Sequence, residues 1–515
     1  MYLTQALHRA AQQTPDAPAT TFGDRVRTWR QHAGRVARLA GALRGLGLRE
    51  GGRVAILARN SDRYAELLLA VPWAGGVFAP VNVRWSPAEI IYSLRDCGAT
   101  ILCADDAFAG QVPALADGYP DLKTVIYLGE GPPPEGMLGH EALVEGGQPA
   151  EDARRGGDAL AGIFYTSGTT GVPKGAMVSH ANLLTMALGQ QVTVPAAHPG
   201  GRALVALPMF HIGAFTLWLP QLLVGGTQVI VPAFEPVAAL ETIARHRVTT
   251  ALLVPTMLQT LVDHPARPGF DLSSVRAFLY GASPISEAVL ERAMRAFPLA
   301  AFTQLYGMTE TAGTTTMLGP DEHRSGRNLR AAGRAAAHAE VRIVDKQDSV
   351  LPRGAVGEVA CRGGHVISGY WNRPRETAEA LRGGWLHTGD AGYMDDDGYV
   401  YLVDRVKDMI VSGGENVYSA EVENAIASHP AVAACAVIAV PDPAWGERVH
   451  AVVVLRPGCT AGAEDIRAHC KTLIAAYKAP RSCEFTDRLP LSAAGKVLKR
   501  ELRRPHWATT DRGVH

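Results

Sequence analysis

The chain of 515 residues is too long for one compact hydrophobic core, so we expect two or more domains. Its hydrophobic content of 47% and charged content of 19% are ordinary for a globular enzyme. Fifty basic and fifty acidic residues give a formal net charge of zero. This balance argues against a nucleic-acid-binding protein, because such binding rests largely on neutralisation of phosphates by a basic surface.

The sequence favours a cytoplasmic protein. Its seven cysteines are scattered without a Cys-x-x-Cys pair, which suggests neither a zinc site nor a disulfide framework and fits a reducing compartment. The first ten residues are polar and amphipathic, unlike a signal peptide. The longest apolar run, 67–81, is too short for a membrane span and contains Pro72 and Pro80. We expect no transmembrane segment and leave peripheral membrane contact and a homodimer open.

Helix and strand patterns alternate along most of the chain. Thr28 and Gln31 are placed as a capping box before a helical pattern, and Ser86-Pro-Ala-Glu89 is a strong helix start. This alternation predicts an α/β fold with a large N-terminal domain of layered α/β subdomains and mostly parallel sheets. Buried strands are predicted at 54–57, 124–128, 160–164, 202–207, 227–232, 250–254, 276–280 and 301–305, and a helix from about His180.

The organisation changes near Asp404. Residues 129–158 are rich in Gly, Pro and Glu and predict a loop or linker. After the boundary the pattern predicts a compact α+β unit of about a hundred residues. We therefore predict an N-terminal domain over 1–404 and a small C-terminal domain over 405–515. The elements that define this change are a strand at 399–403, a helix at 420–428 and strands at 432–440 and 449–455.

The segment Tyr165-Thr-Ser-Gly-Thr-Thr-Gly-Val-Pro-Lys-Gly175 predicts a phosphate site. Its three glycines let backbone N–H groups approach an anion, and its four hydroxyls and Lys174 suit a phosphate-bearing ligand. It is not a Walker A loop, since Lys174 is followed by Gly175 and not by Ser or Thr. A surface linker is the weaker interpretation, because linkers seldom place glycines and a lysine in this way after a buried strand.

This segment resembles the phosphate loop of the acyl-adenylate-forming enzymes, which include acyl-CoA synthetases, adenylation domains and beetle luciferases. Further motifs of that family occur in the same order, and the resemblance covers about residues 5 to 505. It implies a small mobile C-terminal lid domain, with ATP, Mg²⁺ and coenzyme A as cofactor and co-substrates. The matching motifs are Leu207-Pro-Met-Phe-His211, Tyr280-Gly-Ala-Ser283, Gln304-Leu-Tyr-Gly-Met-Thr-Glu310, Trp385-Leu-His-Thr-Gly-Asp390, Asp404-Arg405 and Leu491-Ser-Ala-Ala-Gly-Lys496.

The resemblance implies a role for each motif in binding ATP. The phosphate loop would hold the β- and γ-phosphates, and Glu310 would bind Mg²⁺, which takes hard oxygen ligands. Asp390 would accept hydrogen bonds from the ribose, and Arg405 would reach the ribose or a phosphate. The loop residues are Thr166, Ser167, Gly168, Thr169, Thr170, Gly171 and Lys174, with Thr169 a second metal ligand; Gly281, Ala282, Ser283, Tyr306 and Gly307 would lie at the adenine, and Thr309 at the α-phosphate.

Three further elements complete the implied chemistry. Lys496 would bridge the acid and the α-phosphate, where a cation offsets the repulsion between a carboxylate and a phosphate. Gly413-Gly414 would face the pantetheine of CoA, and His211 would gate the acyl pocket. A structural histidine and a surface lysine are the alternatives for His211 and Lys496 taken alone.

We therefore predict an AMP-forming carboxylic acid–CoA ligase. The segment 441–447 favours CoA as the acceptor, although a stand-alone enzyme that loads a carrier protein stays open. A luciferase-like oxygenase has no support. A catalytically silent homologue is disfavoured, because the charged residues at all five key positions are present: Lys174, Glu310, Asp390, Arg405 and Lys496.

The acid is ranked from the expected pocket walls, 211–215, 280–281 and 307–314. Their small residues leave room for a substantial apolar or planar acyl group, and the absence of Arg and Lys disfavours a dicarboxylate. Medium or long fatty acids come first, hydroxycinnamate-type aromatic acids second and acetate-like acids last. A pocket closed by Phe215 or Met308 would overturn this order. The small residues are Gly213, Ala214, Gly281, Gly307, Ala312 and Gly313.

Overall fold

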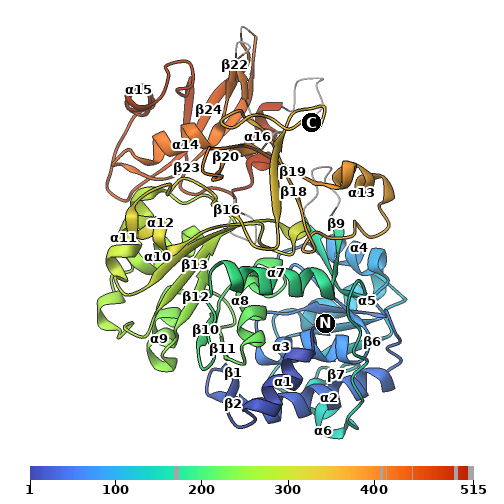
Figure 1. The fold of residues 1–515 in the computed structure, drawn as a ribbon. Coiled ribbons are helices and arrows are strands. Elements are labelled where there is room, and N and C mark those ends of the chain that lie inside the picture. The colour runs from blue at the N-terminus through green and yellow to red at the C-terminus, as the bar shows by residue number, and fades with distance from the viewer. Residues whose placement is uncertain (167–172, 406–409, 413–414, 444, 492–496, 508–515) are drawn as a thin grey trace.

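A computed structural model describes the chain except residues 167–172, 406–409, 413–414, 444, 492–496 and 508–515 (Figure 1). In the described residues the strands form four sheets. Two large sheets make up the N-terminal part, a small antiparallel sheet follows, and a last sheet with its helices forms a separate body at the top of Figure 1. This is the α/β architecture with a small C-terminal domain that the sequence predicts.

The first large sheet carries the stem of the predicted phosphate loop. Its strands are parallel except for β9, which runs antiparallel to β8 at one edge. In spatial order they are β7 (Leu138–Gly139), β6 (Thr124–Tyr127), β5 (Ile101–Ala104), β3 (Arg53–Leu57), β4 (Val77–Pro80), β8 (Leu160–Thr166) and β9 (Lys174–Ser179).

The second large sheet has a parallel centre with antiparallel strands at its edges. Most residues of its central strands are buried, and this explains their largely apolar sequences. In spatial order it contains β16 (Arg334–Ala335), β15 (Thr316–Leu318), β14 (Ala301–Tyr306), β13 (Ala277–Gly281), β12 (Thr250–Leu253), β10 (Arg202–Val205), β11 (Thr227–Ile230), β1 (Pro18–Phe22) and β2 (Arg25–Thr28).

The two remaining sheets are mainly antiparallel. The third contains β17 (Glu340–Val344), β18 (Gly357–Arg362), β19 (Leu386–Met394) and β20 (Val400–Arg405). The fourth contains β22 (Glu415–Val417), β21 (Ile410–Ser412), β24 (Gly446–Leu455), β23 (Val432–Asp442) and β25 (Ser482–Phe485). Strand β20 ends at Arg405 and β21 belongs to the next sheet, so the chain changes sheet beside the predicted domain boundary.

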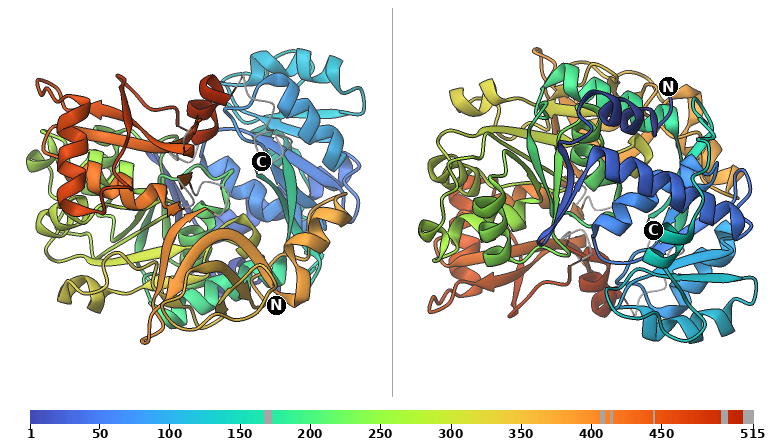
Figure 2. Two further views of the ribbon diagram at one scale, coloured as in Figure 1. Left: turned by 90° about the horizontal axis from the view of Figure 1, so that it is seen from above. Right: turned by 90° about the horizontal axis from the view of Figure 1, so that it is seen from below.

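Helices cover the sheets, and the two helix starts predicted from capping residues are confirmed. Thr28 and Ser86 each form the expected capping box, at the starts of α2 and α4. Figure 2 shows the helices packed around both large sheets. The helices are α1 (Gln5–Gln13), α2 (Trp29–Gly45), α3 (Asp62–Trp73), α4 (Pro87–Cys97), α5 (Val112–Gly118), α6 (His140–Gly146), α7 (His180–Thr193), α8 (Ile212–Leu223), α9 (Pro236–His246), α10 (Pro255–Asp263), α11 (Glu287–Ala296), α12 (Pro320–Ser325), α13 (Pro374–Ala380), α14 (Ser419–Ala427), α15 (Ala463–Leu473) and α16 (Lys499–Trp507).

Two local predictions were incomplete. The predicted loop 129–158 contains helix α6, whose Glu141 pairs with Arg35 and Arg63 at 2.9 and 3.0 Å. This helix is short and Gly-rich at its end, and contacts with other elements stabilise it. Strand β9 intervenes between the phosphate loop and α7, where no strand was predicted, because pairing with β8 supplies its hydrogen bonds.

In the described part of the chain, no helix is both long and apolar enough to cross a membrane. All seven cysteines are free thiols.

Candidate active site

The predicted phosphate loop joins two paired strands. Thr166 is the last residue of β8, Lys174 is the first of β9, and the two are partners in the antiparallel register. The intervening predicted residues Ser167, Gly168, Thr169, Thr170 and Gly171 lie outside the described residues. The hairpin therefore fixes the two ends from which the loop projects.

A segment far along the chain holds this hairpin stem. Tyr370 pairs with Ala176 in an isolated antiparallel bridge. The Trp371 backbone N–H donates to the Gly175 carbonyl at 2.7 Å, and the Trp371 indole N–H donates to the Asp96 carbonyl at 2.9 Å. Segment 369–373 thus pairs alongside β9 and ties it to α4.

Tyr370 contacts two of the predicted catalytic residues. Its hydroxyl donates to Glu310 Oε1 at 2.8 Å, and Lys174 Nζ lies 5.3 Å from the centre of its ring. Glu310 is buried in a single 3-10 turn, Thr309–Thr311, that is separated from β14 by two residues. Burial raises the pKa of Tyr370 well above its ordinary value, and the Glu310 carboxylate raises it further, so the phenol stays a donor. The fold thus joins Lys174 and Glu310 through one aromatic side chain.

A second pair of predicted residues meets at the end of β14. The Tyr306 hydroxyl donates to Asp390 Oδ2 at 2.8 Å. Burial raises the pKa of Tyr306 well above its ordinary value, and Asp390 adds to the shift. In the backbone ladder Asp390 is opposite Arg405, the residue predicted to share the ribose or phosphate. Three predicted ATP-binding positions therefore come together from β14, β19 and β20.

Glu358 on β18 fixes the turn before Asp390. Its carboxylate accepts hydrogen bonds from the Gly389 backbone N–H at 2.9 Å and from Arg382 at 3.1 Å, and it lies 2.9 Å from His387 Nδ1. Gly389 has φ of 70°, a left-handed conformation that glycine adopts without strain. One half-buried acid thus holds the backbone that presents Asp390.

The segment 281–283, which was expected to lie at the adenine, contains one glycine that serves strand packing. Ala282 is exposed and has φ of 67°, which is unusual for a residue with a Cβ and is often associated with functional turns. Gly281 is buried, and a Cβ there would lie 2.1 Å from the Leu305 carbonyl oxygen. Gly281 is therefore required by close approach of β13 and β14. Ser283 is half-buried and follows directly.

The structure corrects the expected acyl-pocket wall. Phe215 is 1% exposed and stacks on Phe78, with ring centres 5.9 Å apart, so it belongs to the core. A Cβ on Gly307 would lie 2.5 Å from the Gly313 carbonyl oxygen, so this glycine serves backbone packing and not ligand space. Among the four glycines of the expected pocket wall, only Gly213 has no close neighbour in the described structure: the nearest atom to a Cβ built there lies 3.9 Å away. His211 precedes α8, and its ring centre lies 4.3 Å from that of Phe210.

Several predicted residues stay predictions. Lys496, Gly413 and Gly414 lie outside the described residues, as does the side chain of Arg405. Thr309 lies in the same 3-10 turn as Glu310, where its predicted α-phosphate contact is not tested.

Sequence reasoning did not find Tyr370 or Glu358. The only sequence signal for Tyr370 is the run Gly369-Tyr-Trp-Asn-Arg-Pro374, an aromatic pair before a helix-starting proline. Glu358 follows a glycine within a strand pattern that carries no motif of its own. Both residues matter through contacts with distant segments.

Comparisons with known proteins agree with this arrangement. The AMP-binding enzyme family matches residues 7–371, and the AMP-binding enzyme C-terminal domain matches residues 421–496. The chain therefore belongs to the AMP-binding enzyme family. Within it, the chain is an AMP-forming acid–CoA ligase.

Individual relatives cover nearly the whole chain. Feruloyl-CoA synthases from an Amycolatopsis and a Streptomyces species are each 42% identical over 501 residues, covering 96% of this chain and 97% of theirs. A fatty acid–[acyl-carrier-protein] ligase from Streptomyces coeruleorubidus is 37% identical over 100% of this chain and 98% of its own. The o-succinylbenzoate-CoA synthetase of Bacillus subtilis, solved with its acyl-adenylate, superposes with a TM-score of 0.85 at 30% identity over 98% of both chains.

Proposed function

We propose that this acid–CoA ligase activates a hydroxycinnamate-type aromatic acid and transfers the acyl group to CoA. The observation that carries this proposal is the 42% identity to two feruloyl-CoA synthases over nearly the whole of each chain. The sequence ranked fatty acids first, but the relatives support the aromatic alternative better. The fatty acid–carrier-protein ligase is the less similar relative, at 37%.

The described pocket segments are compatible with a neutral planar acid. No arginine or lysine occurs in 211–215, 280–281 or 307–314, so none of these segments offers a cation to a second carboxylate. Gly213 has open surroundings beside His211, while Phe215 points into the core. The absence of close contacts at Gly213 is compatible with an acyl group beside His211.

In the proposed first half-reaction, the carboxylate of the acid attacks the α-phosphate of ATP and releases pyrophosphate. The β8–β9 hairpin would present the loop and Lys174 to the β- and γ-phosphates, and Thr309 would bond the α-phosphate. Tyr306 and Asp390 would hold the nucleoside from one side of the site. Lys496 would offset the repulsion between the carboxylate and the phosphate.

The donor set fits a magnesium ion carried with ATP. Glu310 offers a buried carboxylate, a hard oxygen ligand of the kind Mg²⁺ prefers, and Tyr370 orients it through one oxygen. When bound, the ion would neutralise phosphate charge. Glu310 and the loop hydroxyl of Thr169 are the residues we propose to hold it.

In the proposed second half-reaction, the CoA thiol attacks the acyl-adenylate and AMP leaves. The C-terminal domain would turn about Asp404, withdrawing Lys496 and bringing Gly413-Gly414 to the pantetheine. The change of sheet between β20 and β21 supports a hinge at this point.

The test is pyrophosphate release with ATP and Mg²⁺ across ferulate, coumarate, benzoate, hexanoate, dodecanoate and palmitate, with acyl-CoA followed by mass. We expect kcat/KM for ferulate or coumarate to exceed that for any fatty acid by at least about tenfold, since pocket contacts differ by at least 1–3 kcal/mol between such substrates. Lys496→Ala is the negative control. A preference for dodecanoate would refute the aromatic assignment, and thioester formed on a holo carrier protein but not on CoA would refute the acceptor.

A further inference from the structure

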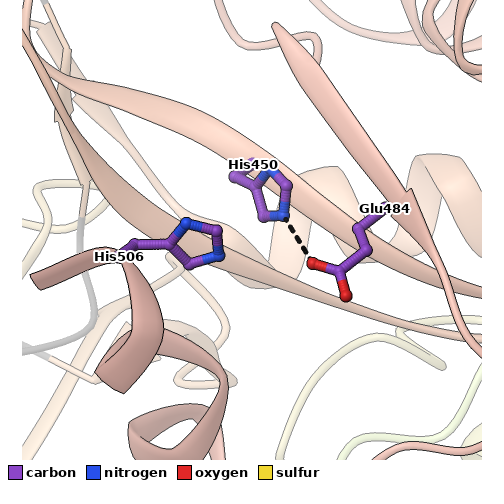
Figure 3. A group of neighbouring side chains, drawn as sticks. All are labelled: His450, Glu484 and His506. Carbon is purple, nitrogen blue, oxygen red and sulfur yellow. Dashed lines mark ion pairs between the residues drawn. The ribbon is translucent and has the colours of Figure 1, made fainter.

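Two histidines and a glutamate meet in the C-terminal domain, away from the residues described above. His450 lies on β24, Glu484 on β25 and His506 on α16 (Figure 3). Strands β24 and β25 are parallel, with His450 opposite Ser482. Because alternate residues of a strand share a face, Ser482 and Glu484 lie on one face, and α16 brings His506 to the same point.

The three side chains are close enough to share an ion. His450 Nε2 and Glu484 Oε2 are 3.8 Å apart, and the rings of His450 and His506 are 5.0 Å apart. One ligand atom from each residue lies within 4.8 Å of the others. Two ligands each about 2.1 Å from a tetrahedral metal are separated by about 3.4 Å, so small side-chain movements would complete the site. The Glu484 side chain is 57% exposed and is able to move.

The burial and hydrogen bonding of His450 suit a metal ligand. His450 is 5% exposed, and its Nε2 atom is buried without a hydrogen-bond partner in the described structure. Its Nδ1 atom lies 2.7 Å from Ser482 Oγ. An Nδ1–H that donates to Ser482 leaves the Nε2 lone pair directed at Glu484 and His506, which is the orientation that outer hydrogen bonds give to metal-binding imidazoles.

The protonation state of His450 agrees with this geometry. Burial is the main cause that lowers the pKa of His450 to about 4, and the neighbouring His506 contributes to this shift. The ring is therefore neutral at pH 7, as a metal ligand must be.

We propose that His450, Glu484 and His506 form a structural site for a divalent transition metal, with Zn²⁺ the best match. Two imidazoles and one carboxylate suit zinc, whereas Mg²⁺ and Ca²⁺ prefer all-oxygen sites. The ion would join α16 to the sheet beside Trp507, whose indole N–H donates to the Ala439 carbonyl at 3.0 Å. Within the described residues this is the one such group of three ligands.

The test is a titration of the untagged full-length protein with CoCl₂, without ATP, followed by visible absorption and then by displacement with ZnCl₂. We expect one equivalent of Co²⁺ to give a tetrahedral absorption band that ZnCl₂ removes. Glu484→Gln, a change at an exposed side chain, and His506→Gln should each weaken binding at least about tenfold, since even an outer-shell change costs that much.

His469→Gln is the matched control. His429 and His469 belong to the same domain, and their ring centres are also 5.0 Å apart, but no carboxylate joins them in a three-ligand group of the described residues. The control should bind Co²⁺ as the unmodified protein does. The proposal is overturned if no Co²⁺ band appears, or if Glu484→Gln and His506→Gln keep the affinity of the control.

Discussion

Removal of the Tyr370 hydroxyl tests the link between the phosphate hairpin and Glu310. In Tyr370→Phe the ring that contacts Lys174 remains, while the 2.8 Å hydrogen bond to Glu310 Oε1 is lost. A hydrogen bond to a charged group contributes about 1.5–3 kcal/mol. The length of 2.8 Å is longer than usual for a hydroxyl bonded to a carboxylate, which places this bond near the lower end, at about 1.5–2 kcal/mol.

If Glu310 acts only when it is correctly oriented, this energy is lost from the adenylation transition state. We then expect kcat/KM for ATP to fall roughly 10- to 30-fold, because about 1.4 kcal/mol corresponds to a factor of ten. The assay is pyrophosphate release at saturating acid, with ATP and Mg²⁺ each varied.

Tyr399→Phe is the matched control for this experiment. The Tyr399 hydroxyl also donates to a glutamate, Glu322 Oε1, at 2.8 Å, but this pair joins α12 to the residue before β20. Both variants should lose similar thermal stability, and only Tyr370→Phe should lose activity. Equal kinetic constants in the two variants would refute a positioning role for Tyr370.

Three further changes test other parts of the structure. Glu358→Ala should raise KM for ATP about tenfold with a smaller effect on kcat, since it frees the Gly389 turn before Asp390 at a cost of about 1–3 kcal/mol; an unchanged KM in the pyrophosphate assay would contradict this. Glu66→Gln should lower the free energy of unfolding by about 3–5 kcal/mol in urea, because it removes the fully buried charge partner of Arg35, 2.5 Å away, and leaves only the partly exposed Glu141 beside this guanidinium, whereas Glu340→Gln in the exposed pair with Arg362 should cost at most about 1 kcal/mol. Burial lowers the pKa of His365 to about 3, so the unfolded chain takes up a proton on this imidazole at a higher pH than the folded protein, and the free energy of unfolding should fall as the pH drops from about 6.5 towards 3. The urea midpoint of unfolding, measured at pH 7, 6 and 5, should therefore fall less steeply in His365→Gln than in the unmodified protein. Equal pH dependence in the two proteins would argue against this assignment.

The sequence by itself determined the local elements and the family. Capping residues at Thr28 and Ser86 set helix starts because a side chain satisfies N–H groups within one turn. Apolar runs predicted the central strands because strands buried on both faces need no alternation. The ordered motifs, from the phosphate loop to Lys496, predicted the acid–CoA ligase chemistry that the relatives support.

Only the tertiary structure decided what joins these parts. Tyr370 and Glu310 are hydrogen-bonded although they are 60 positions apart in the sequence, and Glu358 and Gly389 although they are 31 positions apart. The local sequence pattern carries no information about contacts over such separations. The same limit affected the pocket: small residues at 281 and 307 suggested space, but neighbouring backbone occupies it. A glycine in a sequence shows that something comes close, and the fold decides whether that is a ligand or another strand.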